Sequence, residues 1–217
     1  MSKQLVEQFG NIDIYLFDQL QKGRLDRAVN VLDAGCGGGR NLVYLLKNGF
    51  NVFATDAAPK AIEQVRALAA TLAPDLPLGN FPVVPVEKMP FDDQQFDFVV
   101  SNAVLHFARD GQHFDAMLTE MWRVLREGGI LFARLASSIG IADRVQPLGN
   151  GRYRLPDGSE RFLVDEAMLL EMTNRLNASL LDPIKTTNVQ NLRCMTTWCV
   201  RKNTRDTGGA NREQLEK

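Results

Sequence analysis

A glycine-rich run from Asp33 to Arg40 contains the residues of this sequence best suited to hold a ligand. Gly35, Gly37 and Gly39 permit positive φ angles and let the backbone approach a bound molecule closely. A helix that begins after such a loop offers free N–H groups and the positive end of its dipole. Asp56 ends a second apolar run, where an acid can accept hydrogen bonds from two ribose hydroxyls. The pattern predicts a site for a nucleoside-containing cofactor.

The order of the glycines argues against a dinucleotide. A G-x-G-x-x-G pattern that starts at Gly35 needs its third glycine at position 40, where Arg40 stands. A large side chain there would obstruct the close packing of helix, strand and pyrophosphate. Asp33 would repel a pyrophosphate, whereas it suits a ligand with a positive amino or sulfonium group. A nicotinamide-dependent oxidoreductase stays an alternative, although no Tyr-x-x-x-Lys pair is recognisable.

Apolar strands and amphipathic helices alternate through the first two thirds of the chain. The predicted strands are 29–32, 51–56, 96–101 and 130–135, with a weak one at 83–86, and the helices between them are 42–46, 59–72 and 114–125. This alternation predicts an α/β fold with a parallel sheet and right-handed crossovers. Ligands bind at the carboxyl ends of such strands, where the glycine loop, Asp56, residues 84–88 and Ser101 to Ala103 fall.

The two ends of the chain differ from this pattern. Residues 3–28 have helical spacing and predict an N-terminal helix that caps the domain. Residues 138–162 are polar and rich in glycine and proline, so we expect a long loop or small insertion that forms a substrate lid. A helix at 165–176 and β-rich runs at 179–187 and 192–201 follow. We expect one domain over 1–202 and a disordered tail over 203–217, which lacks apolar periodicity.

Composition excludes several classes of function. The 217 residues carry 25 basic and 26 acidic side chains, a net charge of −1, so no nucleic-acid partner is expected. No apolar run approaches the ~20 residues of a membrane span, and we expect neither a membrane segment nor a signal peptide. Three cysteines without Cys-x-x-Cys spacing indicate no disulfide framework and no zinc site. A cytoplasmic location fits best.

Four segments together are similar to the motifs of the class I S-adenosylmethionine-dependent methyltransferases. Residues 31–41 resemble the family's motif I, and residues 89–97 resemble its "LPF…FD" segment. Residues 99–106 resemble the strand and turn that follow, and residues 120–129 the "E…RVLKPGG" helix and turn. The resemblance covers residues 29–136 closely. It implies a doubly wound, mostly parallel seven-stranded sheet with helices on both faces and an antiparallel last strand.

The resemblance also implies a cofactor and its contacts. S-adenosylmethionine would bind and leave as S-adenosylhomocysteine, after transfer of its methyl group to a small-molecule acceptor. The family's acid for the adenine amino group aligns with Pro85, so that contact passes to the Val86 backbone or to Glu87. The other implied contacts are the loop residues Asp33, Gly35, Cys36, Gly37 and Gly39 for the methionine end, Asp56 for the ribose, Ala57 for adenine, and Asn102 and Ala103 near the sulfur.

The acceptor side offers fewer signals. His106 lies just beyond the predicted strand 96–101 and is the best candidate for a general base, should the acceptor need one, with a packed core histidine as the competing interpretation. His113 could share its helical face, but the pair lacks a third ligand, so no metal is expected. Arginines between Arg134 and Arg161 suggest an anionic small substrate, or simply a solvated loop. A cofactor-binding module without turnover remains a further alternative. We expect the protein to be a monomer or a homodimer.

Overall fold

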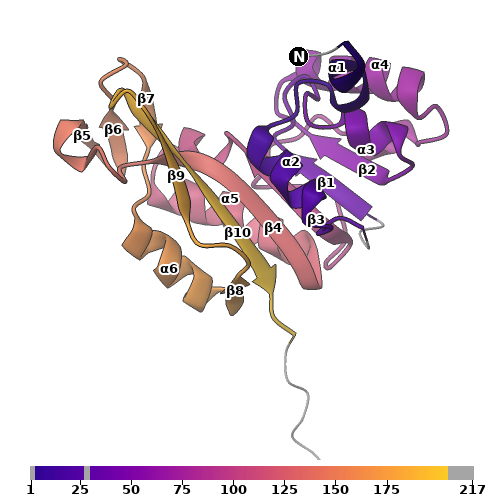
Figure 1. The fold of residues 1–217 in the computed structure, drawn as a ribbon. Helices are drawn as coiled ribbons and strands as arrows, with labels where there is room; N and C mark the ends of the chain where they lie inside the picture. The colour runs from indigo at the N-terminus through magenta and orange to yellow at the C-terminus, as the bar shows by residue number, and fades with distance from the viewer. Residues whose placement is uncertain (1–2, 27–29, 205–217) are drawn as a thin grey trace, which may run out of the picture.

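The protein is described by a computed structural model over residues 3–26 and 30–204, and a seven-stranded sheet forms its centre (Figure 1). The strand order is β2-β1-β3-β4-β10-β8, and β9 also pairs with β10. These strands are β1 (Asn30–Ala34), β2 (Asn51–Thr55), β3 (Phe96–Asn102), β4 (Leu125–Ser137), β8 (Ala178–Leu180), β9 (Lys185–Val189) and β10 (Arg193–Lys202). The predicted seven-stranded α/β sheet is confirmed.

Strand direction follows from the length of the connections. The first four strands are parallel because a helix or a long crossover separates each from the next. β9 and β10 are joined by a short turn at Gln190 and Asn191, both with positive φ, which makes them antiparallel. β10 is also antiparallel to β4. The antiparallel arrangement expected for the end of the chain is thus confirmed.

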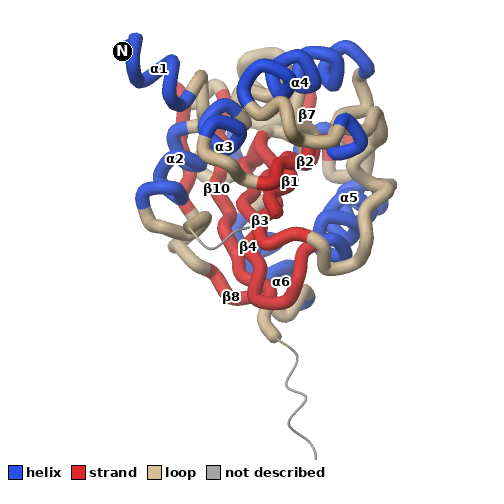
Figure 2. The backbone as a smooth tube through the Cα atoms, turned by 90° about the vertical axis from the view of Figure 1, so that its right-hand side faces the viewer, coloured by secondary structure: helices blue, strands red, loops and turns tan. Residues whose placement is uncertain are grey.

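Helices cover both faces of the sheet, as Figure 2 shows. One apolar core lies under α5 (Gly111–Val124) and α6 (Glu166–Arg175), which pack on side chains such as Phe96, Leu131 and Trp198. A second core lies under α2 (Ile14–Gln21), α3 (Val43–Lys47) and α4 (Pro59–Leu72) on the opposite face. Because side chains of a strand alternate between faces, Val99 belongs to the first core and Phe98 and Val100 to the second.

The N-terminal segment is two helices, so the prediction of one helix over 3–28 is wrong. α1 (Lys3–Phe9) ends at Gly10, whose φ of 64° breaks the helix. A Cβ at Gly10 would lie 2.7 Å from Val43 Cγ2, which requires glycine there. Asp13 then caps α2 by accepting a hydrogen bond from the Tyr15 N–H at 2.9 Å. Residues 27–29 and the tail 205–217 lie outside the described part of the chain.

Two weaker predictions change as well. Residues 83–86 form no strand, because Pro82 and Pro85 lack backbone N–H groups, and Val83 makes just one bridge, to Asp56. The predicted loop at 138–162 contains a second, three-stranded sheet of β5 (Gln146–Gly149), β6 (Arg152–Arg154) and β7 (Glu160–Phe162). We call this second sheet the lid sheet, after the role predicted for residues 138–162. A small apolar cluster of Ala136, Leu155 and Leu163 holds it to the domain. Figure 1 shows it near the carboxyl end of β4.

The lid sheet depends on Gly151, and its replacement gives a first prediction. A Cβ at Gly151 would lie 2.3 Å from Phe162, whose ring stacks on Phe114. Gly149 also has a positive φ, but a Cβ there meets nothing within 4 Å. We expect Gly151→Ala to lower the free energy of unfolding by about 2 kcal/mol more than Gly149→Ala, since only the Cβ at position 151 would collide with the Phe162 ring. Equal losses in urea unfolding would contradict this.

Candidate functional site

The glycine loop is held at the carboxyl ends of β1 and β2. The N–H groups of Gly35 and Cys36 donate to the Thr55 carbonyl at 2.8 and 2.9 Å. The Gly37 N–H donates to Asp56 Oδ2 at 2.9 Å, and Asp56 Oδ1 accepts from the Ala58 N–H at 2.8 Å. The predicted residues of the loop and Asp56 are therefore brought together. Each Asp56 oxygen keeps lone pairs for a further donor.

Asp33 is the most unusual group of this region. Its side chain is 1% exposed, and neither carboxyl oxygen has a hydrogen-bond partner among the described residues. Burial raises its pKa to about 7; the charge of Arg40 lowers it and that of Asp56 raises it further. An unpartnered buried carboxylate is costly, so Asp33 is suited to a ligand that brings a positive group or hydrogen-bond donors.

Asn102 is the last residue of β3, two residues beyond Val100, which pairs with Asp33 of β1. β3 neighbours β1, and both amide atoms of Asn102 are buried without a partner within the described ranges. The next residue, Ala103, has a φ of 62°, a strained conformation for a residue with a Cβ. Ala103 is held there by its N–H, which donates to the Arg134 carbonyl at 2.8 Å. Strain and unpartnered polar atoms thus coincide at the end of β3.

A cavity of about 440 Å³ opens next to Ala103, and we call it the arginine-lined cavity. Its volume is that of a small-molecule site. The lid sheet, β4, β10 and the turn after β3 all contribute to its wall. The lining residues are Ala103, His106, Phe107, Arg134, Ala136, Leu155, Asp157, Ser159, Arg161, Val189, Arg193 and Met195.

His106 lines this cavity as a buried, neutral ring. Its Nδ1 accepts a hydrogen bond from the Ala136 N–H at 3.1 Å. Burial, with the charges of Arg161 and Arg134, lowers its pKa to about 4. Because Nδ1 accepts, the proton of the neutral ring is assigned to Nε2, which can donate but not take up a proton. The geometry therefore favours a hydrogen-bond donor over the general base that the sequence suggested.

The titration of His106 gives a second prediction. In the folded protein its ring is expected to titrate near pH 4, against about 6.5 when unfolded. The unfolded state then binds more protons between these values, so His106 contributes a stability loss on the order of 3 kcal/mol as pH falls from 6.5 to 4. Proton NMR can follow the ring directly, since the sequence has two histidines. A His106 titration near pH 6.5 would contradict the assignment.

Comparison with known proteins identifies the domain. Residues 32–133 match the model of a methyltransferase domain family. An uncharacterised methyltransferase of Synechocystis sp. is 33% identical over 100 residues, 46% of this chain and 43% of that protein. The malonyl-acyl-carrier protein O-methyltransferase of Yersinia pestis is 35% identical over 118 residues, 54% of this chain and 40% of that protein. Residues 32–133 of this chain are a class I S-adenosylmethionine-dependent methyltransferase domain. The chain spans less than half the length of these relatives.

Solved structures agree on the fold of the methyltransferase domain. The 1,6-didemethyltoxoflavin-N1-methyltransferase of Burkholderia thailandensis, solved with its substrate and S-adenosylhomocysteine, superposes with a TM-score of 0.65. It is 21% identical, and the match covers 85% of this chain and 76% of that one. A Methanosarcina mazei S-adenosylmethionine-dependent methyltransferase gives 0.66 at 21% identity, over 86% and 98%. The match to a methyltransferase family decides against the nicotinamide-dependent alternative.

The residues of the methyltransferase site fit S-adenosylmethionine. Asp33 and Asn102 offer buried, unpartnered acceptors and donors, which a cofactor with an amino group and a carboxylate can satisfy. Gly37 leaves open space on its Cα, so the backbone can be approached there. Cys36 is buried, and burial raises the pKa of its thiol, which favours packing over nucleophilic chemistry. Within the described residues no group of His, Cys, Asp or Glu could hold a metal ion.

Two of the predicted adenine contacts follow Pro85 in the chain. Glu87, one of the two predicted adenine contacts, lies with its Oε1 3.2 Å from His113 Nε2. Pro85 accepts a hydrogen bond from the Lys88 N–H at 3.1 Å, and the Val86 side chain is buried. The roles of Ala57, Val86 and Glu87 toward adenine stay predictions. His113 Nδ1 accepts a hydrogen bond from the Arg109 N–H at 3.1 Å, whereas His106 Nδ1 accepts from the Ala136 N–H, so the two rings have different partners.

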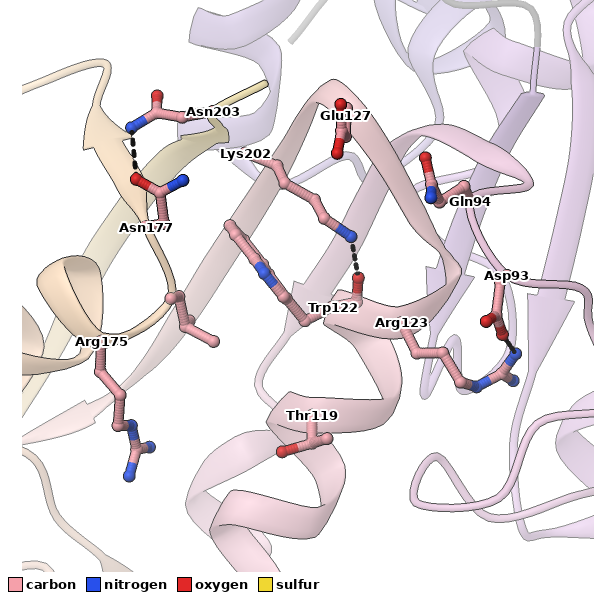
Figure 3. Close-up of a pocket in the computed structure, with 11 residues that line it drawn as sticks. Asp93, Gln94, Thr119, Trp122, Arg123, Glu127, Arg175, Asn177, Lys202 and Asn203 are labelled. Atoms are coloured by element: carbon pink, nitrogen blue, oxygen red, sulfur yellow. Dashed lines mark hydrogen bonds and ion pairs between the residues drawn. The ribbon is translucent and has the colours of Figure 1, made fainter. Parts of the chain in front are cut away.

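A second cavity, of about 570 Å³, lies near the amino end of β3, away from the carboxyl ends of the parallel strands (Figure 3). Its walls include Asp93 and Gln94, before β3, and the last turns of α5. Its charges are largely satisfied: Arg123 pairs with Asp93 at 2.6 Å, and Lys202 Nζ donates to the Trp122 carbonyl at 2.7 Å. Because cofactors of this fold bind at the carboxyl ends of the strands, we exclude this cavity as the methyl-transfer site.

Arg40, which stands where a dinucleotide site needs glycine, is paired with the N-terminal segment. The Arg40 side chain, at the end of the glycine-rich run, pairs with Asp13 at 3.2 Å. Asp13 also pairs with Arg134 at 3.0 Å and caps α2, so it connects the N-terminal helices to the wall of the arginine-lined cavity. No sequence pattern pointed to Asp13, because its partners are 27 and 121 residues away. No helix of the described chain is long and apolar enough to cross a membrane.

Proposed function

We propose that this protein transfers the methyl group of S-adenosylmethionine to a small molecule bound in the arginine-lined cavity, with S-adenosylhomocysteine as product. The observation that carries the proposal is the unpartnered, buried pair Asp33 and Asn102 at the strand ends, next to a cavity of small-molecule size. Bound S-adenosylmethionine supplies an activated methyl group on a sulfonium. The chain then has to align an acceptor with that group.

The residues of the chain act by binding and orientation. Asp33 and the loop Gly35 to Gly39 would hold the methionine end of the cofactor, and Asp56 its ribose. Asn102 and the strained Ala103 would lie between the cofactor and the acceptor. Alignment of two reactants can supply ~7–11 kcal/mol of the barrier, so a strong additional catalytic group is not required.

His106 would orient the acceptor by donating a hydrogen bond from Nε2. Its neutral state and its Nδ1 contact to Ala136 support this role. The proposal implies that the attacking atom of the acceptor needs no proton removed by His106. His106→Gln, whose amide N–H can replace the donor, is therefore expected to keep more activity than His106→Leu. Equal losses in both variants would count against a donor role.

Calorimetry tests the proposed function most directly. The protein is titrated with S-adenosylhomocysteine and, separately, with NADH. Micromolar or tighter binding of S-adenosylhomocysteine and no heat with NADH support the methyltransferase site. Absence of S-adenosylhomocysteine binding by the folded protein would overturn the proposal. If the cofactor product binds but tritiated methyl groups reach no acceptor in a broad small-molecule screen, a binding module without turnover becomes the better description.

The substrates of the relatives do not transfer to this chain. The Yersinia pestis relative acts on malonyl-acyl-carrier protein, but less than half of its length aligns with this chain. The Burkholderia thailandensis enzyme acts on 1,6-didemethyltoxoflavin and shares the fold at 21% identity. The class of acceptor therefore has to come from this chain's own cavity.

A further inference from the structure

We propose that the acceptor is a small organic acid whose carboxylate is held by Arg161 and Arg193, with its apolar body against Phe107, Leu155 and Met195. This inference rests on the proposed function, since it names the class of molecule that fills the same cavity. Its support is the charge, the donor inventory and the shape of the arginine-lined cavity.

The cavity has an excess of positive charge. It is lined by Arg134, Arg161 and Arg193 but by one carboxylate, Asp157. Arg134 is compensated from outside the cavity by Asp13, at 3.0 Å, and also lies over the Tyr15 ring. Arg134 is therefore part of the wall, which leaves Arg161 and Arg193 to meet a ligand.

Arg161 has no carboxylate partner within the described ranges of the chain. Its Nη1 donates to the Glu160 carbonyl at 2.7 Å, and its guanidinium lies 4.9 Å from the centre of the Phe107 ring. The neighbouring arginines of the lid sheet take up the Glu160 carboxylate instead, Arg154 at 2.8 Å and Arg152 at 3.8 Å. Arg161 thus keeps most of its donors, and its plane is fixed by stacking on an aromatic ring.

Arg193 is held loosely. Its Nη1 lies 3.9 Å from Asp157 Oδ2, at the outer limit of an ion pair. Asp157 directs its other oxygen to Ser159, whose N–H and hydroxyl donate at 2.9 and 2.6 Å. Burial raises the pKa of Asp157, but these hydrogen bonds and the charges of Arg193 and Arg161 lower it below its usual range overall. Asp157 therefore stays ionised and offsets one arginine, which leaves a net positive charge.

The remaining groups are complementary to an acid with an apolar body. His106 presents a neutral ring whose Nε2 is a donor, so the polar side of the cavity is rich in donors. Leu155, Val189 and Met195 supply apolar lining, and Phe107, which is 56% exposed, adds an aromatic ring. Guanidinium groups bind carboxylates through two parallel, charge-assisted hydrogen bonds. An amide or an alcohol is neutral and cannot accept both bonds in this way. A neutral or cationic acceptor would leave Arg161 without compensation.

Matched ligand pairs test this class of acceptor. The protein saturated with S-adenosylhomocysteine is titrated with benzoate and hexanoate and with the isosteric benzamide and hexanamide, by saturation-transfer NMR. We expect each acid to bind at least about tenfold more tightly than its amide. Arg161→Gln and Arg193→Gln should each weaken acid binding about tenfold and leave amide binding unchanged. Arg161→Lys, which keeps the charge but not the planar fork, should fall between.

Arg154→Gln is the matched control, because Arg154 is on the same lid sheet but pairs with Glu160 outside the cavity lining. It should leave acid binding unchanged. The inference is overturned if amides bind as well as acids, if neither acid binds at millimolar concentration, or if Arg161→Gln has no effect. In each case S-adenosylhomocysteine must still bind, which also shows that the variant is folded. Loss of S-adenosylhomocysteine binding by the wild-type protein would instead overturn the proposed function.

Discussion

Asp33→Asn is expected to weaken S-adenosylhomocysteine binding by about 100-fold, or ~2.7 kcal/mol, without destabilising the unliganded protein. The Asp33 carboxyl is buried and has no partner within the part of the chain that the structure describes. Asparagine keeps the shape but loses the negative charge that a cofactor amino group would pair with. Removing a buried, unpaired charge relieves its desolvation cost, so the unliganded variant should melt at the wild-type temperature or above it at pH 8.

The same carboxyl makes binding depend on pH. Since its pKa in the unliganded protein is about 7, a proton must leave Asp33 when a cationic group binds below that pH. Affinity for S-adenosylhomocysteine should therefore rise from pH 6 to pH 8 in the wild type and change less in Asp33→Asn. The stability sign is opposite: a raised pKa favours the folded state at low pH, and this contribution is lost as pH rises through 7.

Calorimetry and thermal unfolding of both proteins at the two pH values check these expectations. Asp33→Glu serves as the charge-conserving control, although its extra methylene must fit a buried position. Wild-type affinity in Asp33→Asn would rule out the role given to Asp33. A large fall in melting temperature would show instead that the carboxyl holds the fold, for example through the glycine loop.

Gly35→Ala and Gly37→Ala are expected to separate the folding role of the loop from its binding role. A Cβ at Gly35 would lie 2.5 Å from Val104 Cγ2, and the φ of 81° strains any residue with a side chain. We expect Gly35→Ala to cost about 3 kcal/mol of unfolding free energy, from backbone strain and overpacking together. Urea unfolding measures this directly.

At Gly37 a Cβ meets nothing within 4 Å, although φ is 52°. The folding cost of Gly37→Ala should therefore be about 1 kcal/mol, from backbone strain alone. Its Cβ would project into the space through which a cofactor approaches the loop, so S-adenosylhomocysteine affinity should fall at least about tenfold. If Gly37→Ala binds normally, the open side of the loop does not face the cofactor.

Much of this protein follows from local sequence patterns. The apolar runs that became β1 to β4 and the helical spacing that became α4 and α5 are set by side chains near each other in the chain, so periodicity predicts them. The rule that ligands bind at the carboxyl ends of parallel strands then predicts that Asp33, Asp56 and Asn102 lie on one side of the sheet. In the structure, the glycine loop, Asp56 and Asn102 do lie at the carboxyl ends of neighbouring parallel strands.

Other features depend on contacts that no local pattern contains. Gly10, where the first N-terminal helix ends, packs closely against Val43, and the lid sheet contacts α5 where the Phe162 ring stacks on Phe114. Neither contact can be predicted from helical spacing or from polar composition. The prolines at 82 and 85, by contrast, were visible in the sequence, and they explain why the weak strand did not form.

The chemistry of the site divides in the same way. The family motifs, the glycine loop, His106 and the lid arginines can all be recognised in the sequence. The folded structure was needed to show that His106 Nδ1 accepts a hydrogen bond from the Ala136 N–H, and that Arg193 of β10 and Arg161 of β7 line one cavity. The physical reason is that protonation and charge compensation depend on burial and on partners distant in the chain, whereas periodicity and motif spacing are properties of neighbouring residues.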